Sequence, residues 1–69
     1  MIYPMYSVRD RLVGFNAPFI MPNEDVAKRG FKQRIEKDPN AEDLELYKVG
    51  SFDDETGKVE SELPVMVTF

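Results

Sequence analysis

The stretch NEDVAKRGFKQRIEK, residues 23–37, predicts a single helix and is the starting point for the fold of the whole chain. Asn23 is a preferred N-cap residue, because its side-chain oxygen accepts a hydrogen bond from a free backbone amide of the first turn. Glu24 and Asp25 place negative charge at the positive end of the helix dipole. Pro39 cannot continue a helix, so we expect the helix to end near Lys37.

The apolar residues of this stretch recur with helical spacing. Ala27, Phe31 and Ile35 lie four positions apart and form one stripe. Most of the positions between them carry Lys or Arg, and these are expected to face water. We therefore predict a helix from about Glu24 to Lys37 that packs its apolar stripe against the rest of the domain.

The segments on either side of this helix have the composition of β-strands. Before it come residues 3–8 and an irregular stretch, residues 12–21, in which Pro18 favours the edge of a sheet. After it come residues 44–52, 58–63 and 65–69. The order β-β-α-β-β-β predicts an α+β fold, with a small, mainly antiparallel sheet and one α-helix packed on it.

The 69 residues predict one domain, residues 1–69, with a small core. The chain has no cysteine and no histidine, which excludes disulfides, thiolate metal sites and the usual general base at neutral pH. Self-association is the remaining way to stabilise so small a domain. The uncharged tail VMVTF, residues 65–69, is either a core strand or an edge that pairs with a second copy. In the second case the interface residues are Val65, Val67 and Phe69.

The sequence has no feature that indicates a membrane protein, a secreted protein or an enzyme. No apolar run approaches the ~20 residues of a membrane span, and the N-terminus does not have the pattern of a signal peptide. No nucleophile has a base beside it, and no glycine-rich phosphate loop is present. We therefore expect a soluble intracellular protein that is not an enzyme and uses no cofactor or metal.

The most site-like stretch is GSFDDETGK, residues 50–58, with three consecutive acids. A calcium loop needs ligands at alternating positions, and a glycosidase pair needs carboxylates that face each other. Consecutive acids on a tight turn meet neither requirement. Asp side chains accept hydrogen bonds from turn amides, and Gly57 supplies a positive φ. The stretch therefore predicts a hairpin turn in preference to a metal or catalytic site.

The charges are distributed unevenly along the chain. Residues 1–37 carry seven basic and four acidic residues, a net charge of +3, and residues 38–69 carry two basic and nine acidic residues, a net charge of −7. One interpretation is that this asymmetry has no function and reflects two differently charged solvated surfaces. The functional interpretation is a basic nucleic-acid-binding face with an acidic flank. Its predicted residues are Arg9, Arg11, Lys28, Arg29, Lys32 and Lys37.

Several short motifs occur together in a fixed order. They are YSVRD at residues 6–10, PF at 18–19, an A-x-R-x-F pattern at 27–31, and EDLELYKVGSFDDETG at 42–57. In order and spacing they resemble the small nonstructural protein of gokushoviruses, the single-stranded DNA phages of the Microviridae. The resemblance covers nearly the whole chain.

This resemblance implies an accessory protein in the host bacterial cytoplasm that acts in replication or packaging of a single-stranded DNA genome. The family is usually described as DNA-binding, so single-stranded DNA is the expected partner. The alternative is an acidic interaction module for the replication initiator, a capsid protein or a host replication factor. A homodimer is compatible with both. The family supplies no binding residues, so the basic set above rests on charge pattern only.

Overall fold

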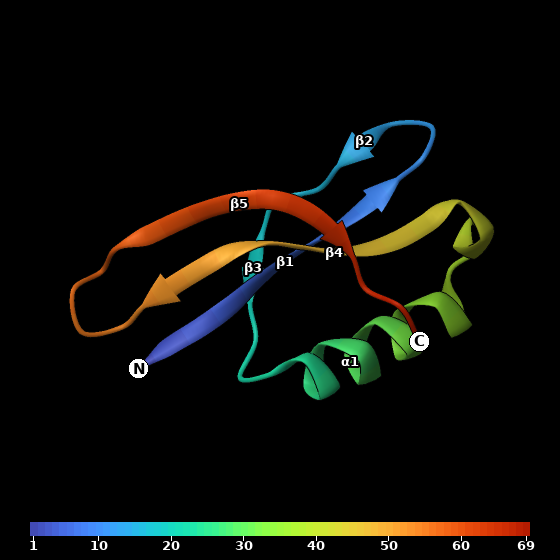
Figure 1. The fold of residues 1–69 in the computed structure, drawn as a ribbon. Coiled ribbons are helices and arrows are strands. Elements are labelled where there is room, and N and C mark those ends of the chain that lie inside the picture. The colour runs from blue at the N-terminus through green and yellow to red at the C-terminus, as the bar shows by residue number, and fades with distance from the viewer.

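The computed structural model describes residues 1–69 and shows a curled antiparallel sheet with one helix against it (Figure 1). The α+β class and the antiparallel sheet agree with the sequence-based prediction. In chain order the elements are β1 (Ile2–Asp10), β2 (Gly14–Phe15), β3 (Phe19–Ile20), α1 (Glu24–Lys37), the 3-10 turn η1 (Ala41–Asp43), β4 (Leu44–Asp53) and β5 (Val59–Met66).

The predicted order of the strands is only partly right. Three strands precede the helix and two follow it, whereas the sequence predicted two and three. Residues 12–21 form two short strands, β2 and β3, that flank Pro18 and pair with different parts of β1. Residues 58–63 and 65–69 are not separate strands, because β5 runs from Val59 to Met66. Pro64 lies in β5 where its pairing with β4 is irregular, so it interrupts the ladder without ending the strand.

The first strand is central to the sheet. The order is β2-β1-β4-β5, with β3 also on β1. β1 pairs with β4 along its whole length, from Ile2 opposite Asp53 to Asp10 opposite Leu44. The long-range pairing of these two strands is therefore the frame on which the other elements are placed.

The helix has the predicted bounds, Glu24–Lys37. The Asn23 side chain accepts a hydrogen bond from the Val26 amide at 2.9 Å, which confirms it as the N-cap. Ala27 and Phe31 are buried against the sheet, and Ile35 packs beside them. The predicted stripe is therefore the face that joins the helix to the sheet. No helix is long and apolar enough to cross a membrane.

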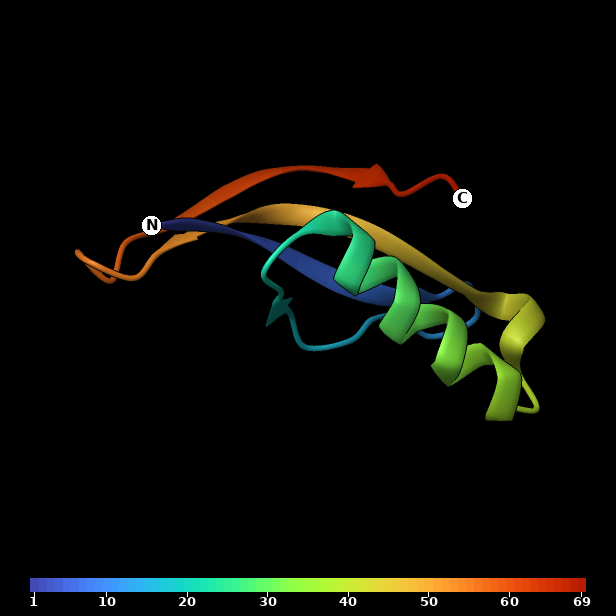
Figure 2. The same cartoon turned by 90° about the horizontal axis from the view of Figure 1, so that it is seen from below.

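The core is small and lies at one end of the sheet. Only 8 of the 69 residues are buried, and the hydrophobic ones are Tyr6, Val8, Ala27, Phe31, Leu46 and Val67. In Figures 1 and 2, α1 lies against the end formed by residues 6–10 and 44–48, the covered end. Residues 2–5 and 50–61 extend beyond the helix and form the projecting end, which carries the β4–β5 turn.

A bulge separates the two ends. The pairing of β1 with β4 shifts between Met5 and Tyr6, where Val49 is the extra residue on β4. Gly50 follows it and is buried, and a Cβ atom at this position would overlap the backbone carbonyl oxygen of Glu60. β5 therefore crosses Gly50 at a distance that only glycine permits.

Candidate nucleic-acid interface

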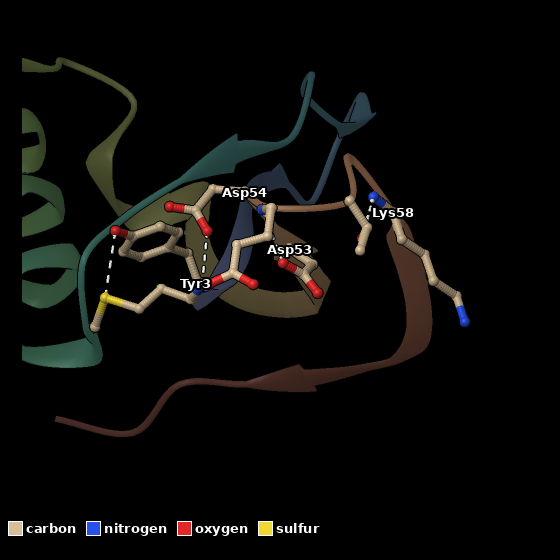
Figure 3. A network of polar contacts seen from close by, with 7 residues as sticks. Tyr3, Asp53, Asp54 and Lys58 are labelled. Atoms are coloured by element: carbon tan, nitrogen blue, oxygen red, sulfur yellow. Dashed lines mark hydrogen bonds and ion pairs between the residues drawn. The ribbon is translucent and has the colours of Figure 1, made fainter.

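The acidic stretch at the tip of the projecting end is a hairpin turn (Figure 3). The Asp53 amide donates to the Lys58 carbonyl at 2.9 Å, and the Gly57 amide donates to the Asp53 carbonyl at 2.8 Å. Gly57 has a φ of +75°, as predicted for this position. The Asp53 carboxylate accepts a hydrogen bond from the Glu55 amide, and this bond lowers the pKa of Asp53. The turn prediction is confirmed.

The other two acids of the turn contact the N-terminal amine. Its nitrogen lies 2.6 Å from Asp54 Oδ1 and 3.4 Å from Glu55 Oε1. The hydrogen bond to Asp54 raises the pKa of this amine. The Tyr3 hydroxyl donates to the Met1 sulfur at 3.6 Å (Figure 3). The Asp54 and Glu55 carboxylates thus join the start of β1 to the β4–β5 turn, and the three acids do not form a group that could hold a metal ion.

Four of the six predicted DNA-binding residues lie on α1. Lys28, Arg29 and Lys32 line one shallow depression on the solvent side of the helix, together with Asp25, Gln33 and Glu36. Lys28 pairs with Glu24 at 3.7 Å. Arg29, Lys32 and Lys37 make no ion pair and are exposed, with Lys37 in the last helical turn. The helix therefore presents three cations without an ion pair, Arg29, Lys32 and Lys37, on a surface that also carries Asp25 and Glu36.

An aromatic ring lies on the same surface. Phe69 is 60% exposed, and its ring centroid is 5.8 Å from Lys28 Nζ and 5.6 Å from Lys32 Nζ. The ring packs on Phe31 with centroids 5.6 Å apart. The Val67 amide donates to the Leu46 carbonyl at 2.8 Å, which directs the chain after β5 toward the helix. Cations and an exposed ring are the two components that single-stranded nucleic acid requires of a binding surface.

The two remaining predicted residues, Arg9 and Arg11, lie elsewhere and are paired with acids. Val8 points into the core, so Arg9 projects from the opposite face of the sheet. Its guanidinium lies 3.5 Å from Glu45 Oε1, a buried oxygen with no hydrogen-bond partner. Arg11 lies 3.5 Å from Asp43. The structure thus does not bring Arg9 together with the helix cations, and it neutralises both arginines locally.

The three residues of the predicted dimer interface do not share one surface. Val67 is 7% exposed and belongs to the core, so in this conformation its side chain is not available to a second copy. Val65 is 63% exposed on β5, and Phe69 lies on α1. At Val67 the core interpretation of the tail is correct, because its side chain belongs to the buried cluster that includes Leu46 and Phe31.

The position of Phe69 beside the lysines does not follow from the sequence pattern. An uncharged tail favours a strand, in the core or in a dimer, over a contact with the polar side of a helix. One available signal was the spacing of Val67 and Phe69, which puts both side chains on the same side of an extended segment. A core position for Val67 would therefore have predicted that the Phe69 side chain also lies near α1.

Comparison with known proteins identifies one family. No curated protein and no solved structure matches this chain. The family described as Phage ORF5 protein matches residues 3–68, a range that includes the helix and all five strands except Ile2, the first residue of β1. The chain therefore belongs to the Phage ORF5 protein family and is a bacteriophage protein.

Proposed function

We propose that this phage protein binds single-stranded DNA through the solvent side of α1, without catalysing a reaction. The observation that carries the proposal is the exposed Phe69 ring beside Lys28 and Lys32. Lysine ammonium groups neutralise phosphates, and an aromatic ring offers a face on which any base can stack. Arg29 extends the cationic surface along the same side of the helix.

The proposed setting is the cytoplasm of a bacterial host. The resemblance to the small nonstructural protein of gokushoviruses supports a role in replication or packaging of a single-stranded genome. A sequence-tolerant surface suits that role, because a protein that coats or delivers a genome must accept every sequence. The acidic projecting end would face away from the DNA and limit binding to the helix side.

Fluorescence anisotropy with a labelled thymidine oligonucleotide tests the proposal. If Lys28, Arg29 and Lys32 each neutralise one phosphate of a single strand, affinity should fall roughly 20-fold between about 50 and 200 mM salt. The variant Lys28→Glu/Lys32→Glu should lose binding. The control Lys48→Glu/Lys58→Glu changes the net charge equally but alters residues paired with Glu62 and Glu60.

Two results would contradict the proposal. One is no binding by the unmodified protein at the lower salt concentration. The other is equal loss of binding in both double variants, which would indicate a response to net charge with no defined site. Phe69→Leu separates the two components, since removing the ring should weaken binding without changing the salt dependence.

A second candidate is an acidic interaction module, and the projecting end favours it. Asp54 and Glu55 at the turn and Glu60 and Glu62 on β5 are exposed along this end. Its partner would be a basic protein, such as the replication initiator, a capsid protein or a host replication factor. Glu60→Lys/Glu62→Lys should then abolish capture of the partner from infected cells, and Lys28→Glu/Lys32→Glu should leave it unchanged.

A further inference from the structure

The face of the sheet opposite α1, the upper side in Figure 1, is covered by no other helix or strand. Alternation along β1 places Tyr6 and Val8 toward the helix and Tyr3, Met5 and Arg9 on the opposite face. The pairing partners of those residues share that face. We call it the helix-free face, and its main apolar side chains are Met5, Phe15, Ile20, Tyr47, Phe52 and Val59.

This face is mainly apolar and partly accessible, and its buried polar residue, Ser7, donates its hydroxyl to the Asn16 carbonyl at 2.7 Å. Phe15 is 49% exposed, Ile20 is 44% exposed and Val59 is 58% exposed. Phe15 packs edge-on against Tyr47 with centroids 5.2 Å apart, and Phe52 lies opposite both Tyr3 and Val59 in the sheet. Scattered exposed apolar residues are normal on a protein surface, but a whole sheet face of this composition marks an interaction site.

The charges of the helix-free face cancel each other. Arg9 and Glu45 are opposite one another in the β1–β4 ladder and form an ion pair at 3.5 Å. Arg9 is also 3.4 Å from the Tyr47 hydroxyl and 5.9 Å from the centre of the Phe15 ring. A face with one internally neutralised pair has no electrostatic preference for a basic or an acidic partner. It is compatible with a copy of itself.

The size of the molecule is compatible with a dimer-forming subunit. Its accessible surface is 4912 Å², against roughly 4,450 Å² expected for a monomer of 8.0 kDa. The two longer dimensions of the molecule, 39 and 21 Å, set an upper limit of roughly 800 Å² on one face, which is about what each partner of a standard interface buries. A second copy would therefore need to cover most of the sheet face.

We propose that two copies of this chain pack their helix-free faces together around a twofold axis. The arrangement is a sandwich of two sheets with the two helices on the outside. Each copy would bury Met5 and Phe52 near the centre, with Ile20 and Val59 beside them. The helix surface of each copy stays free, so this inference is independent of the proposed DNA site.

A single strand of DNA is the competing occupant, since bases could stack on Phe15 and Tyr47. Two observations favour the second copy. First, the cation of this face, Arg9, forms an ion pair with Glu45. The tip of the projecting end carries Asp53, Asp54 and Glu55, which repel phosphate. Aliphatic side chains such as Ile20 and Val59 offer no ring for a base.

Sedimentation equilibrium of the full chain, without DNA, tests the proposal. The unmodified protein should be a dimer of about twice 8.0 kDa at high micromolar concentration. Ile20→Lys should raise the dimer dissociation constant at least 100-fold, because the twofold axis brings each new charge into the interface twice. Leu12→Lys is the matched control, since Leu12 is 81% exposed in the β1–β2 turn and lies outside the face.

Other outcomes would overturn the proposal. They are a monomeric unmodified protein at every concentration, or a dimer that Ile20→Lys leaves intact. If Ile20→Lys loses its helical circular dichroism, Val59→Lys at the other side of the face replaces it. Amide shifts of the unmodified protein on dilution give an independent readout and should change around Met5 and Phe52. Changes confined to β5 would instead indicate pairing of sheet edges.

The oligonucleotide titration distinguishes a second copy from single-stranded DNA as the occupant of the helix-free face. A monomer whose DNA affinity falls with Ile20→Lys would assign the face to DNA and overturn the dimer. If the protein is a dimer that does not bind DNA, the dimer proposal is supported and the proposed DNA-binding function is contradicted. A dimer that binds DNA through Lys28 and Lys32, with Ile20→Lys affecting only the dimer, is the expected result.

Discussion

The covered and projecting ends of the sheet are built from the same two strands, yet different interactions stabilise them. At the covered end, Tyr6, Val8 and Leu46 are buried under Phe31 and Val67. At the projecting end, β1 and β4 continue their ladder, but β5 is exposed along its whole length and no helix packs there. Side-chain packing therefore fixes one end, whereas backbone pairing, a glycine crossing and a turn fix the other.

The largest expected effect comes from a pair of equal truncations. Phe31→Ala should destabilise the domain by about 3–5 kcal/mol, because it leaves a cavity in the only buried cluster. Phe52→Ala at the projecting end should cost clearly less, because Phe52 is only partly buried. Urea unfolding at low micromolar concentration measures both. Equal costs would show that the two ends form one core.

The destabilisation caused by these two truncations should depend differently on protein concentration. If a second copy covers Phe52, the cost of Phe52→Ala should increase as the protein concentration is raised into the dimer range. The cost of Phe31→Ala should not, since this side chain is already buried in a single copy. A constant cost for Phe52→Ala would count against the dimer interface on this face.

The next effect compares two glycines. Gly50→Ala should cost about 1–3 kcal/mol, because the new methyl group would overlap the Glu60 carbonyl and force β5 away from β4. Gly30→Ala is the matched control. At Gly30 a Cβ atom would have only the Met21 methyl group nearby, at 3.8 Å, and alanine is the better helix former by about 1 kcal/mol. Thermal unfolding should therefore show opposite signs, and a stabilising Gly50→Ala would contradict the close crossing.

The smallest effect is the acid response of the turn. The Glu55 amide holds the pKa of Asp53 below its ordinary value of 3.8, so the carboxylate stabilises the fold fully above that pH. This contribution should be lost as the pH falls through the lowered pKa of the folded state. Carboxyl carbon NMR titration of Asp53 measures the midpoint. Asp53→Ala should remove this part of the pH dependence of stability, and a midpoint at or above 3.8 would contradict the turn geometry.

The sequence was most informative where a local rule decides the structure. The cap at Asn23, the stripe through Phe31 and the turn glycine at Gly57 are each set by residues within a few positions, and all three agree with the structure. The two-residue strands β2 and β3 could not be predicted in this way. Each exists only because β1 offers an edge to pair with, and two residues carry no periodic signal of their own.

In the candidate site, too, features set by local sequence could be predicted, whereas features set by strand pairing could not. The helix cations could be predicted because helical spacing puts Lys28 and Lys32 on one face. The neutralisation of Arg9 by Glu45 depends on the register of β1 with β4, which no local pattern encodes. The position of Phe69 on the helix depends in turn on Val67 entering the core. Charge counts therefore predicted cations that lie together on α1 and overestimated the extent of the basic surface.

The place of β1 in the chain has a consequence for synthesis. β1 is made first, but its partner β4 begins at Leu44 and the core is completed by Val67. At bacterial translation rates, roughly 3 to 12 s separate the synthesis of Val8 from that of Val67. A helix of the length of α1 is marginal without packing, so it cannot shelter the apolar residues of β1 during that time. We therefore expect β1 to be packed only after Val67 has been translated.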